Sequence, residues 1–109
     1  MTTPLPGRAS RGSTSGQPLM ATFDLLGRRW TMRILWELKA GPLSFRALQS
    51  ACDGVSPSVL NRRLKELRVS LLIAPAAEGY VLAPLGQRLM QDLDPLRDWS
   101  KSWAEALST

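Results

Sequence analysis

Apolar side chains recur at steps of three and four residues along most of the chain, which predicts a mainly helical fold. The predicted helices cover residues 18–26, 30–39, 44–52, 56–71 and 84–109. Two short apolar runs, 71–74 and 80–82, are partly β-branched and flank a stretch with Pro75 and Gly79, so they predict a β-hairpin. The alternative is that residues 71–73 extend the helix before them.

The segment 56–71 carries two faces of opposite chemistry. Ser56 is a favourable N-cap and Pro57 suits the first helical position, so two signals mark where this helix begins. The buried stripe is expected to consist of Leu60, Leu64, Leu67 and Leu71. The opposite face carries Ser58, Asn61, Arg62, Lys65 and Arg68. Hydroxyls and Lys suit phosphates, whereas Asn and Arg can contact base edges, although ordinary solvated helices also carry such faces.

The segment before this helix favours the DNA-binding interpretation. Residues 44–52 predict a shorter helix with Ser44 as its N-cap, and the turn 53–55, which contains Gly54, leads directly into Ser56. A helix, a short turn and a second helix with a basic outer face form a helix-turn-helix, whose second helix enters the major groove. With the hairpin as its wing, the predicted fold is a winged helix-turn-helix, mainly α with a small β-hairpin and an added C-terminal dimerisation helix.

Basic side chains outnumber acidic ones by 14 to 9, and they are unevenly spread. Two groups of four, each beside a single glutamate, lie in residues 28–39 and in the recognition helix: Arg28, Arg29, Arg33 and Lys39, then Arg62, Arg63, Lys65 and Arg68. Acidic residues predominate after residue 85. We therefore expect one end of the molecule to contact phosphates, with nucleic acid as the anionic partner.

The composition argues against enzyme chemistry. The chain has 109 residues, enough for one small domain, with a single cysteine and no histidine. Its acidic residues are expected at scattered, solvent-facing helix positions, so we predict no catalytic site, no metal site and no cofactor. A polar start and the lack of a long apolar run predict a cytoplasmic protein without a membrane segment.

Residues 1–17 are rich in Gly, Pro, Ser and Thr, so we expect a disordered basic tail before a domain that spans residues 18–109. Arg8 and Arg11 in this tail could act as an arm in the minor groove, but basic tails are frequent and mostly without function.

The last predicted helix carries a long apolar stripe and a step, Asp94-Pro95, that is expected to kink or break it. The stripe either packs on the first helix of the same chain or forms a two-fold dimer contact. We favour the dimer because so long a stripe is costly to leave in water. The predicted dimer contacts are Leu19, Phe23, Leu89, Leu93, Leu96, Trp99 and Trp103. Trp36 lies off the stripe of its own helix and is expected to cover a neighbouring helix or to join a subunit contact.

With these residues in view, the chain resembles the HxlR family of winged-helix transcriptional regulators. The matching stretches are residues 24–35, 41–48, 55–67 and 80–86. The resemblance implies a homodimer that binds an inverted-repeat operator, with dimer contacts from the first and last helices. Three features depart from the family pattern. Gln17-Pro18 replaces the Cys-Pro pair through which some members sense oxidants, the wing is short without a basic tip, and Arg28-Arg29 replaces the usual Gly-Lys.

The predicted function is a dimeric, sequence-specific regulator that binds double-stranded DNA. The predicted DNA contacts are Ser56, Ser58, Asn61, Arg62, Arg63 and Lys65, with Arg29 and Ser44 at phosphates. Arg63 points partly sideways, so it is expected either to reach a phosphate or to brace the domain. In a symmetric dimer the two recognition helices should lie roughly 34 Å apart. No small-molecule effector is identified by these residues.

Two alternatives stay open. A winged-helix protein-interaction module, with weak or no DNA binding, would suit the short wing, whose tip lacks Lys and Arg. Cys52 is expected to be a buried apolar filler, because a redox switch would need an exposed thiol of low pKa.

Overall fold

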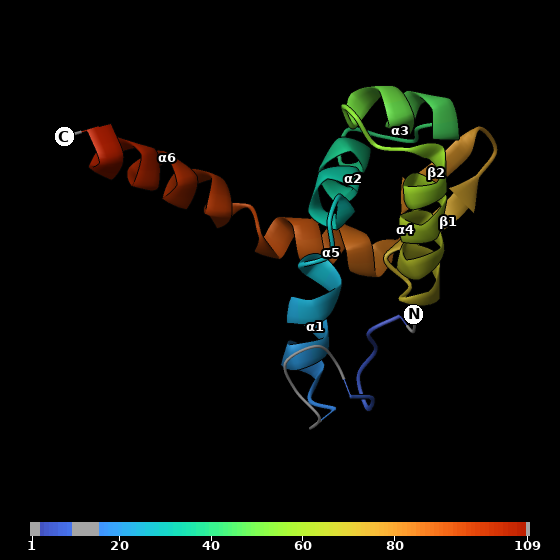
Figure 1. Ribbon diagram of the computed structural model, residues 1–109, viewed down its shortest axis with the longest axis horizontal. Helices are drawn as coiled ribbons and strands as arrows, with labels where there is room; N and C mark the ends of the chain where they lie inside the picture. Colours follow the sequence, from blue (N-terminus) through green and yellow to red (C-terminus); the bar gives the residue numbers. More distant parts are fainter. Residues whose placement is uncertain (1–2, 10–15, 109) are drawn as a thin grey trace.

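A computed structural model describes residues 3–9 and 16–108, and its helices and hairpin follow the predicted order (Figure 1). The elements are α1 Pro18–Leu26, α2 Thr31–Leu38, α3 Phe45–Ala51, α4 Pro57–Val69, β1 Ile73–Ala76, β2 Gly79–Leu82, α5 Pro84–Asp92 and α6 Pro95–Ser108. The fold is mainly helical with a two-stranded antiparallel hairpin, as the hydrophobic pattern predicted.

The core lies where α2, α3, α4, the hairpin and α5 meet. Its fully buried side chains include Ile34, Leu35, Leu38, Leu48, Leu60, Leu64 and Leu67. The last three are the stripe predicted for the recognition helix, and their burial determines which side of α4 faces outward. Burial of one such side chain stabilises the fold by roughly 1.5–3 kcal/mol.

The recognition helix ends at Val69, two residues earlier than predicted. The Leu71 N–H donates to the Arg68 carbonyl at 3.1 Å, and the Leu72 N–H donates to the Leu67 carbonyl at 2.9 Å. Helices commonly end with this pair of bonds, which requires a left-handed residue. Leu71 is that residue, with φ of 67°. Its side chain is 64% exposed, so the prediction that it completes the buried stripe is wrong.

The hairpin is confirmed, but its first strand begins two residues later than predicted. Ile73 pairs with Leu82 and Ala76 with Gly79, so residues 77–78 form the turn. Pro75 lies within β1, which proline tolerates because β1 is an edge strand. The alternative, in which residues 71–73 extend the helix, is therefore excluded.

A third short segment joins the wing from the other side. The Leu43 N–H donates to the Tyr80 carbonyl at 3.0 Å, and the Tyr80 N–H donates to the Leu43 carbonyl at 2.9 Å. A Cβ at Gly79 would overlap the Leu43 carbonyl, and Gly79 has φ of 143°, so this approach requires glycine. The bridge ties the start of the helix-turn-helix to the wing, and nothing in the hydrophobic pattern predicted it.

The last helical region breaks at the predicted step. α5 ends at Asp92 and α6 begins at Pro95, and α6 extends away from the body as an arm (Figure 1). None of the residues described in α6 is buried. Trp99 and Trp103 are 58% and 57% exposed, so they do not pack on α1 of the same chain.

Residues 3–9 of the N-terminal segment lie within the described part of the chain. Pro4 is buried, and Pro4 and Leu5 line a cavity of about 310 Å³ together with Leu25 of α1 and Leu89 of α5. This part of the segment therefore borders the same cavity as α1 and α5. Arg8 is exposed, whereas Arg11 lies outside the described residues.

Among the helices that the structure describes, none combines the length and the apolar character needed to cross a lipid bilayer.

Leu71→Gly is expected to raise the free energy of unfolding by about 1 kcal/mol, because a left-handed conformation costs a residue with a Cβ about 1–2 kcal/mol. The exposed side chain contributes little burial that could be lost. Val69→Gly is the control: this residue is also exposed, but it is the last residue of α4 and has no left-handed backbone to relieve, so glycine should lower stability there. Urea unfolding measures both changes, and a loss of stability in the Leu71 variant would contradict this account.

Candidate nucleic-acid interface

Two serine caps organise the helix-turn-helix. The Ser44 Oγ accepts a hydrogen bond from the Ala47 N–H at 3.0 Å, and the Ser56 Oγ accepts one from the Val59 N–H at 3.2 Å. Both caps were predicted, and both are confirmed. A capping hydroxyl accepts through its oxygen, so its proton remains available to a phosphate oxygen. Ser58 lies beside Ser56, with 3.4 Å between the hydroxyl oxygens.

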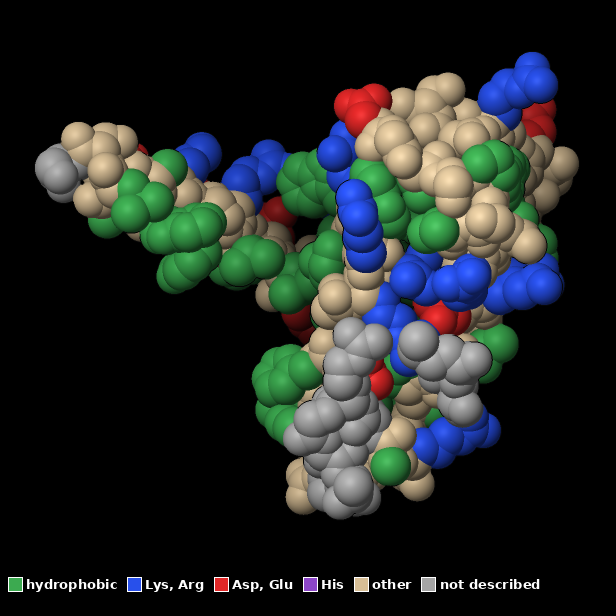
Figure 2. All heavy atoms as spheres, viewed as in Figure 1, with side chains coloured by type: hydrophobic (Ala, Val, Ile, Leu, Met, Phe, Trp, Pro, Cys, Tyr) green, Lys and Arg blue, Asp and Glu red, His purple; other side chains and the backbone are tan. Residues whose placement is uncertain are grey.

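The outer face of α4 presents polar side chains that are exposed to solvent. Asn61, Arg62 and Lys65 form no hydrogen bond or ion pair with any residue that the structure describes. They share one side of the helix with Ser58 because their spacing follows the helical repeat. Figure 2 shows Lys and Arg side chains in a band over α4 and the neighbouring end of α2. The polar groups are thus directed outward and remain available to a ligand.

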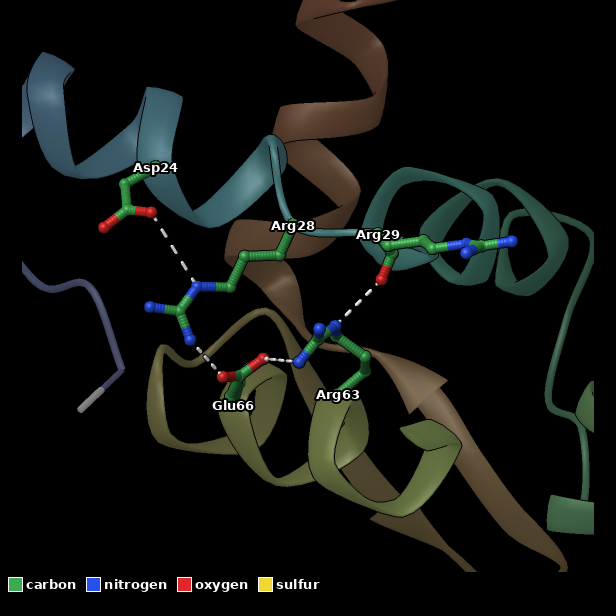
Figure 3. A network of polar contacts seen from close by, with 5 residues as sticks. All are labelled: Asp24, Arg28, Arg29, Arg63 and Glu66. Atoms are coloured by element: carbon green, nitrogen blue, oxygen red, sulfur yellow. Dashed lines mark hydrogen bonds and ion pairs between the residues drawn. The ribbon is translucent and has the colours of Figure 1, made fainter. Parts of the chain in front are cut away.

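Arg63 is turned to the flank of α4 and braces the domain. Its Nε donates to the Arg29 carbonyl at 2.8 Å, and its Nη1 donates to Glu66 at 3.0 Å (Figure 3). The side chain is 14% exposed. Of the two roles predicted for Arg63, the structure shows the bracing one.

Glu66 continues a buried network that the sequence analysis did not predict. Its carboxylate also accepts a hydrogen bond from the Arg28 Nη1, and the Arg28 Nε lies 3.8 Å from Asp24 (Figure 3). Asp24, Arg28 and Glu66 are all buried. The expectation that acidic residues lie only at solvent-facing positions is therefore wrong for two of them, and Arg28 is unavailable to phosphates.

The other basic residues between α1 and the end of α2 are also largely occupied. Arg33 Nε donates to Glu37 at 2.7 Å, which raises the pKa of the guanidinium, and its Nη2 donates to the Ala51 carbonyl at the end of α3. Lys39 lies 3.5 Å from Asp94. Arg29 is exposed and forms no ion pair within the part of the chain that the structure describes. Of the predicted basic region, the side chains that stay available to phosphates are therefore Arg29 and those on the outer face of α4.

The wing adds no positive charge at its tip. The turn between β1 and β2 consists of Ala77 and Glu78, both exposed. A carboxylate there is unfavourable near phosphates, so α4 is the main candidate surface.

The predicted dimer contacts divide into two groups. Five are exposed: Leu19, Phe23, Leu96, Trp99 and Trp103. Leu89 and Leu93 are half-buried, and Leu89 packs against the core of its own chain. Trp99 and Trp103 stack with 5.5 Å between ring centroids. Figure 2 shows apolar side chains along one side of the arm that α6 forms, which leaves an apolar stripe open to solvent.

Trp36 lies where α2 meets the first turn of α6. The residue is 43% exposed, and two cations lie over its ring, with the Lys39 Nζ at 4.5 Å and the Arg97 guanidinium at 4.7 Å from the ring centroid. These contacts help to position the arm relative to the body. Trp36 thus contacts α6 of its own chain through Arg97, and its predicted part in a subunit contact stays a prediction.

Cys52 is fully buried at the end of α3. Burial raises the pKa of its thiol, with Arg33 opposing that shift more weakly. A buried thiol with a raised pKa supports the predicted filler role.

Comparison with known proteins agrees with this geometry. The profile of the HxlR-like helix-turn-helix family matches residues 25–108. The chain belongs to this family. An uncharacterized HTH-type transcriptional regulator of Methanocaldococcus jannaschii is 34% identical over 91 residues, which cover 80% of this chain and 86% of that protein. The HTH-type transcriptional regulator YodB of Bacillus subtilis is 27% identical over 101 residues, or 86% and 90% of the two chains.

Solved structures of transcriptional regulators share the fold. Quinone-bound YodB from B. subtilis superposes with a TM-score of 0.72 at 27% identity and covers 77% of this chain and 96% of its own. A possible HxlR family transcriptional factor from Thermoplasma volcanium gives a TM-score of 0.70 at 28% identity, over 82% and 86% of the two chains. These relatives are named as transcriptional regulators, and the chain is accordingly a winged helix-turn-helix protein of a DNA-binding regulator family.

Cys52 of this HxlR-type chain should resist thiol reagents. We expect maleimide labelling at pH 8 to be on the order of 100-fold slower in the native protein than in concentrated urea, because the thiol is reached only through opening of the fold. A C52A/S50C variant carries its thiol at an exposed position of α3 and should react at similar rates in both conditions. Equal rates for native and unfolded wild-type protein would show that Cys52 is accessible.

Proposed function

We propose that this HxlR-type protein is a sequence-specific regulator that binds an inverted-repeat operator in double-stranded DNA as a homodimer, with α4 in the major groove. One observation carries the proposal. Asn61, Arg62 and Lys65 lie on one exposed face of α4 and have no partner among the described residues. Long polar side chains held on a rigid helix and left without partners are suited to contact base edges and phosphates.

The proposed contacts follow from the donor groups. Asn61 and Arg62 can form paired hydrogen bonds with base edges, whereas Lys65 is a point charge suited to a phosphate or a guanine. The serine hydroxyls at Ser44, Ser56 and Ser58 lie at helix N-termini, where phosphates are favoured. Arg29 contributes a phosphate contact beside them. Arg63 is left out of this set, because its donors are directed at Arg29 and Glu66.

The homodimer is proposed from the uncovered apolar stripe. Leu96, Trp99 and Trp103 on α6, with Leu19 and Phe23 on α1, expose large apolar surfaces in the single chain. Exposed apolar surface of this extent usually marks an interface. A two-fold arrangement would cover the stripe of one copy with the stripe of the other and would give the two α4 helices the symmetry of an inverted repeat.

A protein-interaction module is the second candidate function. The short wing favours it, because its tip, Ala77 and Glu78, carries a carboxylate and no Lys or Arg that could contact a phosphate. This candidate requires little affinity for any duplex and a partner whose binding is insensitive to salt.

Arg62→Ala is expected to weaken binding to a duplex selected from a random pool by about 1–3 kcal/mol and to relax the base preference at one position of each half-site. Arg29→Ala is the comparison: it should weaken all sequences alike and reduce the steepness of the salt dependence. Fluorescence anisotropy over a range of salt concentrations measures both. Wild-type affinity in both variants at moderate salt would refute the assignment of these faces.

Trp103→Glu is expected to convert the wild-type dimer to monomers, because loss of a central aromatic contact typically costs about 2–4 kcal/mol and the new carboxylates would face an apolar stripe. Sedimentation velocity at micromolar concentration measures the change. Glu105→Gln is the control, since helical spacing places Glu105 on the side of α6 opposite Trp103 and Leu107. A monomeric wild-type protein, or a dimeric Trp103 variant, would argue against this interface.

A further inference from the structure

Four charged side chains form a chain of alternating sign between α1 and the recognition helix. Asp24 on α1 faces Arg28 in the following turn, Arg28 pairs with Glu66, and Glu66 pairs with Arg63 on α4 (Figure 3). None of these four side chains is more than 14% exposed. Removing charges from water is costly, so each of these groups depends strongly on the position of its partners.

The ion pairs hold α4 at its flank. The helical repeat places Arg63 and Glu66 between the buried stripe, which includes Leu64 and Leu67, and the outer face that carries Arg62. Apolar contacts along the stripe have no direction and tolerate small rotations of a helix. Paired hydrogen bonds at the flank are directional, so they restrain rotation of α4 about its own axis and its tilt relative to α1.

The other end of the network lies on a helix of the proposed dimer interface. Asp24 is buried on the inner side of α1, whereas the preceding residue, Phe23, is 59% exposed on the outer side. The same network holds the turn between α1 and α2, because the Arg29 carbonyl accepts a hydrogen bond from Arg63. The next residue, Trp30, has φ of 76°, in the left-handed region. A bulky residue is strained in that region, so this turn needs such support.

We propose that Arg28 and Glu66 are positioning residues that set the distance and angle between the two recognition helices of the dimer, and so determine the spacing between the operator half-sites. This inference rests on the proposed function. Neither side chain contacts DNA in this scheme; both act by linking α4 to α1. The reading of bases within a half-site depends on Asn61 and Arg62, which lie outside the network.

The preferred spacing of half-sites should respond sensitively to how firmly Arg28 and Glu66 link α4 to α1. Each added base pair moves one half-site by about 3.4 Å along the duplex and rotates it by roughly 35°. A dimer with rigidly linked helices should therefore bind one spacing best and reject its neighbours. A dimer whose α4 helices can rotate should accept neighbouring spacings more readily.

The test uses duplexes that carry two copies of the half-site selected by the wild-type protein, with spacers varied in steps of one base pair. Affinity for each spacer is compared in wild type, Glu66→Gln and Arg28→Lys. Gln retains the shape of Glu without its charge, and Lys retains the charge of Arg without its fork of donors. Glu105→Gln is the control, because it removes the same charge from the exposed helix α6. Circular dichroism and thermal melting identify the folded variants that enter the comparison.

We expect the ratio of affinities between the best spacer and its neighbours to fall by about 2- to 30-fold in both variants, with unchanged base preference inside each half-site. The control should retain the wild-type ratio. Equal weakening at all spacers, with the ratio unchanged, would assign the network a merely structural role and overturn the inference. The same holds if the wild type shows no preferred spacing. A wild-type protein that selects no duplex at all would instead refute the proposed function.

Discussion

Burial of one leucine stripe on α4 is the constraint on which the rest of the structure depends. Leu60, Leu64 and Leu67 are packed in the core, and their spacing leaves only the opposite side of the helix for solvent. The polar side chains at positions 61, 62 and 65 are therefore presented outward by packing and not by contacts of their own. An exposed polar face arises here because a stable core needs the other face of the same helix.

Two classes of charged side chains in this protein differ in burial: exposed side chains without partners among the described residues and buried side chains in ion pairs. Arg62 and Lys65 are exposed, so water screens them and they remain available to phosphates or bases. Arg28 and Glu66 are buried, where an unpaired charge would be strongly destabilising, so they must pair. The net charge of +5 therefore overstates how basic any one surface is. It is the location of the unpaired cations on α4 that supports a role in nucleic-acid binding.

In the single chain, the apolar stripe of α6 is not covered. α6 packs on the body mainly through its beginning, where Arg97 lies over Trp36, and its apolar stripe continues into solvent beyond that point. Long apolar stripes are seldom left uncovered in water. Symmetric pairing would cover the stripe. It would also fix the position of the two α4 helices relative to each other, as the proposed inverted-repeat operator requires.

Local signals in the sequence determined where the elements begin and what each helix presents. Ser44, Ser56 and Pro57 act within a few residues, so the two caps, the helix order and the outer face of α4 were predictable. Tertiary structure alone decided the buried pairing of Arg28 with Glu66 and the bridge of Leu43 to Tyr80, because these partners lie about forty residues apart. Hydrophobic periodicity describes which side of a helix is apolar, but it does not reveal which distant charges meet when that side is buried.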